Sequence, residues 1–200
     1  MPKLTALILI SVAVLVGATA CGDEEPAPGV AAYNDYRELE DARNDAESQL
    51  RQAISGINDA AVAEDRDAVL AAADDGLAAV KAIDKALEAE TEAARELGEI
   101  SKIAGDAKDL ENGLADTRES LTFFERMLNI AIEDPFLEKD GNQEKVGNLA
   151  VEGTNLAVQG ELAVRAADRK IALALGLEPR NDEVLDNPLA PTTSTPTTTG

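Results

Sequence analysis

The chain has 200 residues, of which 39 are Asp or Glu and 18 are Lys or Arg, so its formal net charge is −21 at pH 7. This charge argues against nucleic-acid binding and against adsorption to anionic lipid, because both need basic patches. The chain has no His, no Trp and one Cys. Without His, Ser-His-Asp catalysis, Cys-His catalysis and di-iron bundles built on Glu-x-x-His motifs are excluded.

The first 22 residues have the pattern of an export signal. Lys3 precedes an unbroken run of apolar and small residues over positions 4–16, and small residues then lead to Cys21. A short basic region, an apolar segment and small residues before a cleavage point are typical of a secretory signal peptide. The apolar run is too short to span a bilayer core, which takes about 20 residues.

Ala18-Thr19-Ala20-Cys21 resembles the lipobox of bacterial lipoproteins, although Ala18 stands where lipoboxes usually carry Leu. The resemblance covers only the first 22 residues. It implies that residues 1–20 are removed and that Cys21 is lipidated, which would anchor the chain on the extracytoplasmic face of the cell membrane. The same residues satisfy the A-x-A rule of ordinary signal peptidase, so free secretion is the alternative. The sole Cys lies at the cleavage point, which favours the lipoprotein interpretation.

The remaining chain divides into three parts by composition. Residues 21–30 are acidic with two prolines, which predicts a short, semi-extended tether. Residues 31–178 are long enough for one domain with its own core. Residues 179–200 are rich in Pro and Thr and cannot bury apolar area, so we expect a disordered tail.

Four stretches of the domain have the periodicity of amphipathic helices, with apolar or small residues at steps of three or four. The first covers about residues 31–63, with the stripe Ala32, Tyr36, Leu39, Ala42, Ala46, Leu50, Ala53, Ile57 and Ala60. The second follows a turn at residues 64–67, with the stripe Leu70, Ala73, Leu77, Val80, Ile83 and Leu87. The third runs to about residue 133, with the stripe Ala107, Leu110, Leu114, Thr117, Leu121, Phe124, Leu128 and Ala131. Its steps alternate three and four throughout, the period of left-handed coiled-coil packing, and Pro135 ends it.

The fourth stretch covers about residues 144–175 and carries small residues at steps of seven: Val146, Gly153, Gly160, Ala167 and Ala174. Because a helical Gly costs about 1 kcal/mol relative to Ala, this edge predicts close approach of another helix. Together the four stretches predict an all-α fold, an antiparallel four-helix bundle with long helices. The alternative is a three-helix arrangement in which the second helix continues through Gly98 and Gly105.

The charged clusters do not indicate catalysis or metal binding. We interpret one acidic group as a solvated helix face supported by nearby Lys and Arg, comprising Asp74, Asp75, Glu88, Glu90, Glu92 and Glu96. Residues 138–144 alternate oxygen-bearing side chains but lack the spacing of an EF-hand, so we interpret them as a turn and helix cap. No catalytic residue, metal site or cofactor is predicted.

Bulky side chains gather around the end of the third stretch. Phe123, Phe124, Met127 and Phe136 either close one end of the core or form an apolar site for a partner. Because Phe123 and Phe124 are adjacent, both cannot point to the same core line, so at least one is expected to be partly exposed or to cover a second helix. Tyr33 and Tyr36 lie next to the tether and are expected to pack at the end of the bundle; the alternative is contact with the membrane or a partner.

The sequence therefore predicts a lipid-anchored helical bundle of the bacterial cell envelope that acts by binding. Its role would be that of a non-catalytic scaffold, adaptor or accessory subunit, with a protein partner in the envelope and the membrane held through Cys21. It is not expected to be an enzyme. The alternative is an extracytoplasmic receptor domain for a small ligand or cation. We recognise no family in the helical domain.

Overall fold

The computed structural model describes residues 29–179, which form four helices and no strand. They are α1 (Val30–Val62), α2 (Arg66–Gly98), α3 (Ala104–Glu133) and α4 (Asn142–Leu175). The predicted all-α four-helix fold is confirmed. The three-helix alternative is wrong, because α2 ends at Gly98 and a turn separates it from α3. The predicted signal peptide, Cys21 and most of the tether and tail lie outside the described residues.

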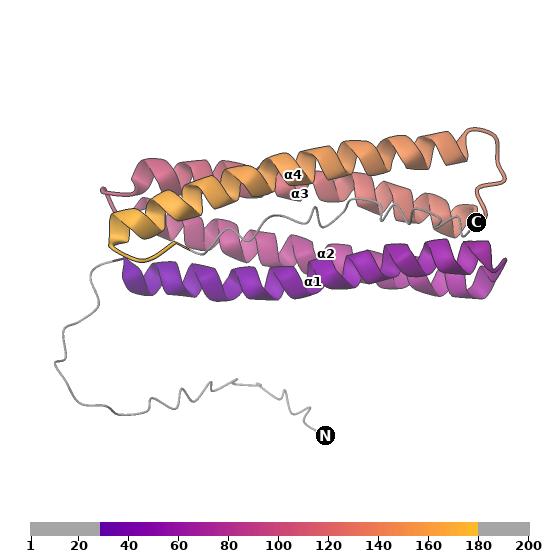
Figure 1. The fold of residues 1–200 in the computed structure, drawn as a ribbon, viewed down its shortest axis with the longest axis horizontal. Helices are drawn as coiled ribbons and strands as arrows, with labels where there is room; N and C mark the ends of the chain where they lie inside the picture. The colour runs from indigo at the N-terminus through magenta and orange to yellow at the C-terminus, as the bar shows by residue number, and fades with distance from the viewer. Residues whose placement is uncertain (1–28, 180–200) are drawn as a thin grey trace, which may run out of the picture.

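Consecutive helices pack side by side and run in opposite directions along the bundle (Figure 1). Ion pairs show the register: Asp84 of α2 meets Arg118 of α3, whereas Arg95, further along α2, meets Glu111, an earlier residue of α3. The backbones of α1 and α4 lie farther apart than those of the three consecutive pairs. At a rise of about 1.5 Å per residue, helices of this length make a rod about 50 Å long.

The two ends of the rod differ in what they contain. At one end the start of α1 meets the α2–α3 turn and the end of α4, since a Cβ built at Gly29 would lie 2.6 Å from Ile100 Cδ1 and 3.2 Å from Leu175 Cδ2. We call this the proximal end. The distal end carries the α1–α2 turn at residues 63–65 and the α3–α4 loop at residues 134–141 (Figure 1).

The distal loop is organised by one carboxylate. The side chain of Asp134 accepts hydrogen bonds from the backbone nitrogens of Glu138 and Lys139, at 3.1 and 2.9 Å, and from Asn142 Nδ2 at 2.9 Å. These bonds lower the pKa of the Asp134 carboxyl, with the bond from Asn142 contributing most. Asp134 therefore fixes the path from α3 into α4.

The core follows the predicted stripes most closely in α3. All eight residues predicted for its stripe are buried. In α1 the prediction is partly wrong: Ala42 is exposed and Arg43 is buried in its place. The acidic group of α2 is also not uniformly solvated, because Glu90 is fully buried.

The predicted close approach on α4 is present and involves α3. A Cβ built at Gly113 would lie 2.8 Å from the backbone nitrogen of Val164, and one built at Gly160 would lie 2.7 Å from the backbone nitrogen of Thr117. Real Cβ atoms do not approach a backbone this closely. Glycine at both positions therefore lets the two helix backbones come into contact.

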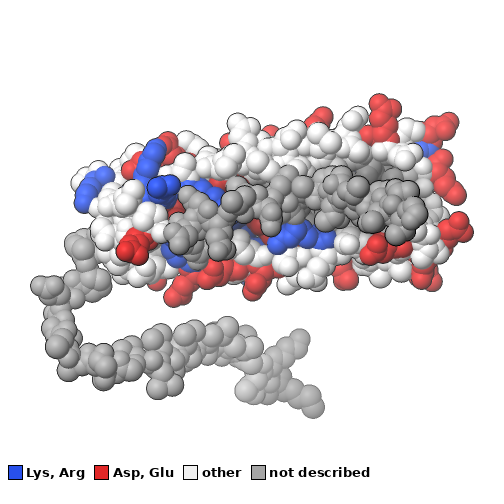
Figure 2. Space-filling view, viewed as in Figure 1, with Lys and Arg blue, Asp and Glu red and all other residues white. Residues whose placement is uncertain are grey.

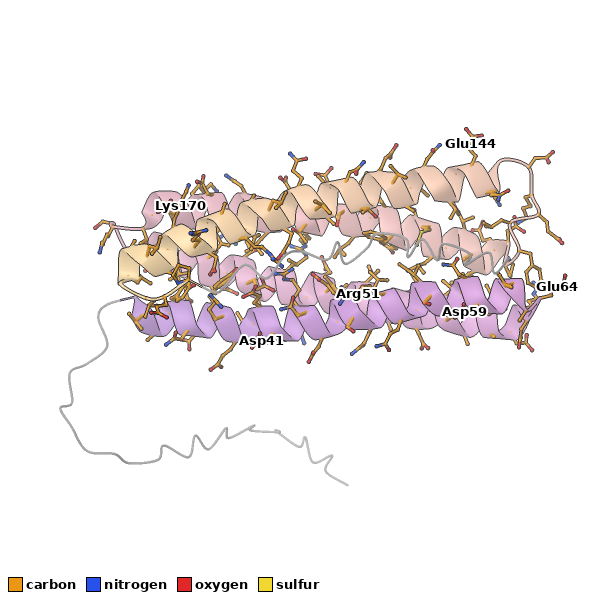
Figure 3. All side chains as sticks on the ribbon, in the orientation of Figure 1. Asp41, Arg51, Asp59, Glu64, Glu144 and Lys170 are labelled. Carbon is orange, nitrogen blue, oxygen red and sulfur yellow. The ribbon has the colours of Figure 1, made fainter. Side chains whose placement is uncertain are left out.

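The charged side chains of the chain are mainly acidic. Figure 2 shows acidic side chains along the whole length of the visible face, with basic side chains between them. Asp41, Asp59 and Glu144 point away from the bundle (Figure 3). Among residues 29–179, no helix has the length and apolarity needed to cross a membrane.

Candidate functional site

The residues predicted to bind a partner lie together toward the distal end. Phe124 and Met127 belong to the core, with 3% and 8% of their surface exposed. Phe123 and Phe136 are half-buried. A Cβ built at Gly153 would lie 3.0 Å from Phe123 Cβ and 3.3 Å from the Phe124 ring, so both side chains pack against α4. Phe124 and Met127 therefore fill the core. Phe123 and Phe136 leave part of their side chains exposed, and this surface is available to a partner.

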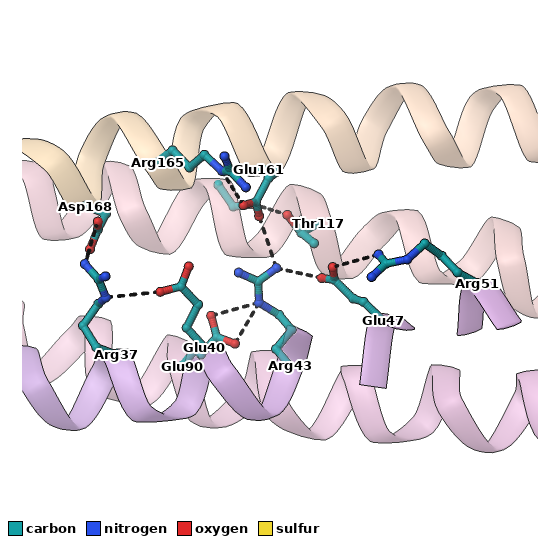
Figure 4. A network of polar contacts seen from close by, with 11 residues as sticks. Arg37, Glu40, Arg43, Glu47, Arg51, Glu90, Thr117, Glu161, Arg165 and Asp168 are labelled. Atoms are coloured by element: carbon teal, nitrogen blue, oxygen red, sulfur yellow. Dashed lines mark hydrogen bonds and ion pairs between the residues drawn. The ribbon is translucent and has the colours of Figure 1, made fainter. Parts of the chain in front are cut away.

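A second cluster lies inside the bundle and was not predicted. We call it the polar layer, and it consists of Arg43 and Glu47 of α1, Glu90 of α2 and Glu161 of α4 (Figure 4). Arg43 Nε donates to both carboxylate oxygens of Glu90, at 2.9 and 3.2 Å. Arg43 Nη1 donates to Glu47 at 2.8 Å and to Glu161 at 3.1 Å. One buried guanidinium thus joins three helices.

Further ion pairs extend the polar layer toward the proximal end. Arg37 Nη1 lies 3.1 Å from Asp168 Oδ2 and 2.7 Å from Tyr33 Oη, which itself donates to Asp168 at 2.7 Å. Arg37 Nε lies 3.3 Å from Glu40. Tyr33 and Tyr36 are buried, as the sequence predicts, near this end. These long side chains span the wider gap between α1 and α4.

Burial changes the acidity of the groups in and around the layer. The pKa of Glu90 rises from 4.5 to about 7. Burial disfavours the charged carboxylate, and this effect is larger than the stabilisation of that charge by Arg43. Burial also raises the pKa of the Glu40 carboxyl and, strongly, that of the Tyr36 phenol. The pKa of Arg43 rises because its carboxylate neighbours outweigh desolvation, so it stays charged.

Three buried donors in this region have no hydrogen-bond partner in the structure: Tyr36 Oη, Arg43 Nη2 and Arg37 Nε, the last of which lies in an ion pair with Glu40. Leaving a buried donor unpaired costs about 1–3 kcal/mol. Arg43 holds all three carboxylates of the layer, those of Glu47, Glu90 and Glu161, in ion pairs. What this arrangement does is hold α1, α2 and α4 in one register.

The sequence contained an unused indication of the layer. Arg43 lies seven residues after Tyr36 and seven before Leu50, both buried. Glu90 lies seven residues after Ile83 and seven before Leu97, also both buried. A charged residue at a stripe position, matched by an opposite charge on the neighbouring stripe, predicts a buried pair.

A shallow groove of about 240 Å³ lies on the surface between α2 and α3. Its polar part is the ion pair between Arg118 Nε and Asp84 Oδ1, at 2.6 Å, and Leu121 contributes to its apolar part. Across residues 29–179, no group of three or more His, Cys, Asp or Glu side chains is placed to hold a metal ion.

The chain was compared with known families, curated proteins and solved structures. No family model matches it, and neither a curated protein nor a solved structure matches it significantly.

Proposed function

We propose that this protein is a lipid-anchored helical rod on the extracytoplasmic face of a bacterial membrane, acting as a non-catalytic binding or scaffold component of the envelope. The observation that carries the proposal is the position of α1 relative to the lipobox-like sequence. Only eight residues separate Cys21 from Val30, and α1 opens the rod at its proximal end. A lipid on Cys21 would therefore hold that end near the membrane.

Chain dimensions support this arrangement. Eight extended residues reach at most about 29 Å, which is shorter than the rod. Two acyl chains hold a protein stably in a bilayer, whereas one holds it only marginally. The domain would then need no lipid affinity of its own, and its acidic surface would be repelled by anionic lipid.

The distal end is where we place contact with an envelope partner. Phe123 and Phe136 retain partly exposed aromatic surface near that end, and aromatic side chains are enriched at protein interfaces. A partner bound there would be held away from the membrane by the length of the rod.

Metabolic labelling with palmitate tests the anchor. The full-length chain is expected to incorporate label and to fractionate with membranes, and Cys21→Ser should abolish both. Label-free wild-type protein that retains Met1 would refute the proposal.

Crosslinking and pull-down from solubilised membranes test the partner site. Phe136→Asp is expected to lose the partner while the helical content is retained, because part of the Phe136 side chain is exposed and lies outside the helices. Asp59→Ala, an exposed change on α1, is the control. Full partner recovery with folded Phe136→Asp would remove this site from the proposal.

The groove between α2 and α3 favours a second candidate, a receptor for a small ligand or cation. A thermal-shift screen with calcium, polyamines and lipids separates the two. No shift is expected for the scaffold. A shift that Arg118→Ala abolishes would instead support a ligand site at the groove, since Arg118 lines it.

A further inference from the structure

The seam between α1 and α4 is the side of the bundle where long polar side chains join the helices. The backbones of α1 and α4 lie farther apart than those of the consecutive pairs. Arg37 of α1 lies 3.1 Å from Asp168 of α4, and Arg43 of α1 lies 3.1 Å from Glu161 of α4. Three buried donors at this seam have no hydrogen-bond partner: Tyr36 Oη, Arg37 Nε and Arg43 Nη2. The seam therefore has hydrogen-bonding capacity that the described residues do not use.

Basic side chains gather along the same seam. All the basic residues of α1 and one of α4 belong to its network: Arg37, Arg43, Arg51 and Arg165 (Figure 4). They stand against the carboxylates of Glu40, Glu47, Glu90, Glu161 and Asp168. Residues 29–179 as a whole contain 16 basic and 33 acidic residues. The seam therefore repels an acidic segment of chain less than the average surface of the rod does.

The chain that follows α4 begins at one end of this seam. A Cβ built at Gly29, just before α1, would lie 3.2 Å from Leu175, the last residue of α4, so α1 begins where α4 ends. Residues 180–200 continue from this end and lie outside the described residues. The Pro/Thr composition that predicts disorder belongs to residues 188–200. The preceding segment, residues 180–187, differs in carrying three carboxylates and two large apolar side chains: Asp182, Glu183, Asp186, Val184 and Leu185.

We propose that residues 180–187 turn back along α4 and bind in the α1–α4 seam, where their carboxylates pair with Arg37 and Arg43. On α4, Asp168 marks the height of Arg37 and Glu161 marks the height of Arg43. These two residues lie 7 and 14 positions before the end of α4. At a rise of about 1.5 Å per residue, the two arginines are therefore about 11 and 21 Å from that end.

The spacing of the carboxylates matches these heights. An extended chain covers about 3.3–3.6 Å per residue, so a chain that turns back at Pro179 carries Asp182 and Glu183 about 10–14 Å along the seam. Asp186 reaches about 23–25 Å on the same path. The carboxylates would then accept charge-assisted hydrogen bonds from the unpartnered donors of both arginines. Bound in this way, the segment fastens α1 to α4 on the side where their backbones do not meet.

Crosslinking with a short bismaleimide in the full-length Cys21→Ser chain tests the proposal. Val184→Cys is combined with Arg165→Cys, which lies at the seam about 15 Å from the end of α4 (Figure 4). The matched control combines Val184→Cys with Glu88→Cys, an exposed position at the same height on α2 and close to Arg118 of α3. The seam pair is expected to give at least about tenfold more crosslink within one chain, because binding raises the effective concentration of the two thiols.

Charge reversal in the segment tests the pairing with arginine. Adding Asp182→Lys and Asp186→Lys to the seam pair should lower the yield to that of the control, because like charges then face each other. A lysine beside a thiol increases the thiolate fraction, so a lower yield cannot come from the reactivity of the introduced cysteine. Thr193→Lys and Thr197→Lys place the same two side chains in the Pro/Thr part and should leave the yield unchanged.

The other outcomes overturn the proposal in distinguishable ways. Equal yields for Arg165→Cys and Glu88→Cys exclude binding in the seam. A seam yield that survives Asp182→Lys and Asp186→Lys excludes pairing with the arginines, and a yield lost equally with the two Thr substitutions shows a general charge effect instead. Crosslinks that form only between two chains mean that the segment binds a second copy. All these chains carry Cys21→Ser, so the result does not depend on the lipid anchor.

Discussion

Arg43 and Glu90 are charged residues in places that apolar side chains occupy elsewhere along the same stripes. Taking two charges out of water costs several kcal/mol per ion, and the pair repays this only with good geometry. Here Arg43 donates to both oxygens of Glu90, while Glu47 and Glu161 remain partly exposed. We therefore expect the pair to contribute more to the choice of register than to net stability.

Single and double substitutions should separate these contributions. Arg43→Leu leaves Glu90 buried without its cation and is expected to lower the free energy of unfolding by about 3–5 kcal/mol. Arg43→Leu with Glu90→Leu should recover most of that loss, because no uncompensated charge remains buried. Urea titrations of the wild-type chain, Arg43→Leu, Glu90→Leu and the double variant give the four free energies of unfolding that the double-mutant cycle needs.

Arg51→Leu is the control for this cycle. Arg51 is partly exposed and lies 4.0 Å from Glu47, and such surface pairs contribute less than about 1 kcal/mol. If the Arg43 and Glu90 losses add up in the double variant, the two side chains do not act as a pair.

Glu90 also predicts how stability depends on pH. Its folded pKa is about 7 against an ordinary value of 4.5, so between these pH values the folded state binds more protons than the unfolded state. Stability must then fall as the pH rises through this window. The contribution is about 3 kcal/mol, and Glu40, whose pKa is also raised by burial, acts in the same direction.

Thermal unfolding at pH 5 and pH 7.5 measures this effect. The wild-type chain is expected to be more stable at pH 5, and Glu90→Gln should reduce the difference, because Gln has no charge to lose. The groups with lowered pKa values, Asp134 and Glu111, act in the opposite direction, and their stabilisation is lost only as the pH falls below about 4. Equal pH dependence in wild type and Glu90→Gln would mean that Glu90 is not the responsible group.

At the scale of whole helices, the contact between α3 and α4 depends on two glycines. Gly160→Ala would place a Cβ against the backbone of α3, and the helices would have to separate. We expect a loss of about 1–3 kcal/mol, the range for overpacking in a core. Gly147→Ala, on the same helix with no atom within 4 Å of the new Cβ, should stabilise the protein by about 0.5–1 kcal/mol.

The comparison of Gly160→Ala with Gly147→Ala isolates packing from helix propensity, because both changes improve propensity equally. Denaturant unfolding of the two variants and the wild-type chain measures the change in the free energy of unfolding for each. Stabilisation by both would mean that α3 and α4 are not in backbone contact at Gly160.

Helix positions and the α3 stripe could be predicted from the sequence because α3 keeps one regular apolar period from Ala107 to Ala131. The side of α1 that faces the core could not be predicted fully, because small residues occur on several sides of this helix. Ala42 fits an apolar stripe as well as Arg43 does, yet Arg43 is the buried residue. Which charges are buried depends on pairing between helices: Glu90 resembles its exposed neighbours Glu88 and Glu92 until Arg43 is placed opposite it.

The shape of the whole molecule determines what an anchor at one end would do. The α2–α3 turn, which carries Lys102, lies at the proximal end close to where α1 begins. The α3–α4 loop, which carries Asp140, lies at the distal end. If Cys21 holds the rod upright, these two positions differ in distance from the bilayer by about 50 Å. A rod lying along the membrane would place both near the surface.

Fluorescence quenching by lipids labelled in the headgroup distinguishes these orientations. Lys102→Cys and Asp140→Cys are exposed sites for a thiol-reactive fluorophore, and a lipidated Cys21 would not react. We expect strong quenching at position 102 and little at position 140, because the acidic surface disfavours contact along anionic lipid. Cys21→Ser chains, released from the membrane, should show quenching at neither site. Equal quenching at both positions in the anchored chain would contradict an upright rod and would move partner contact from the distal end to the sides of the bundle.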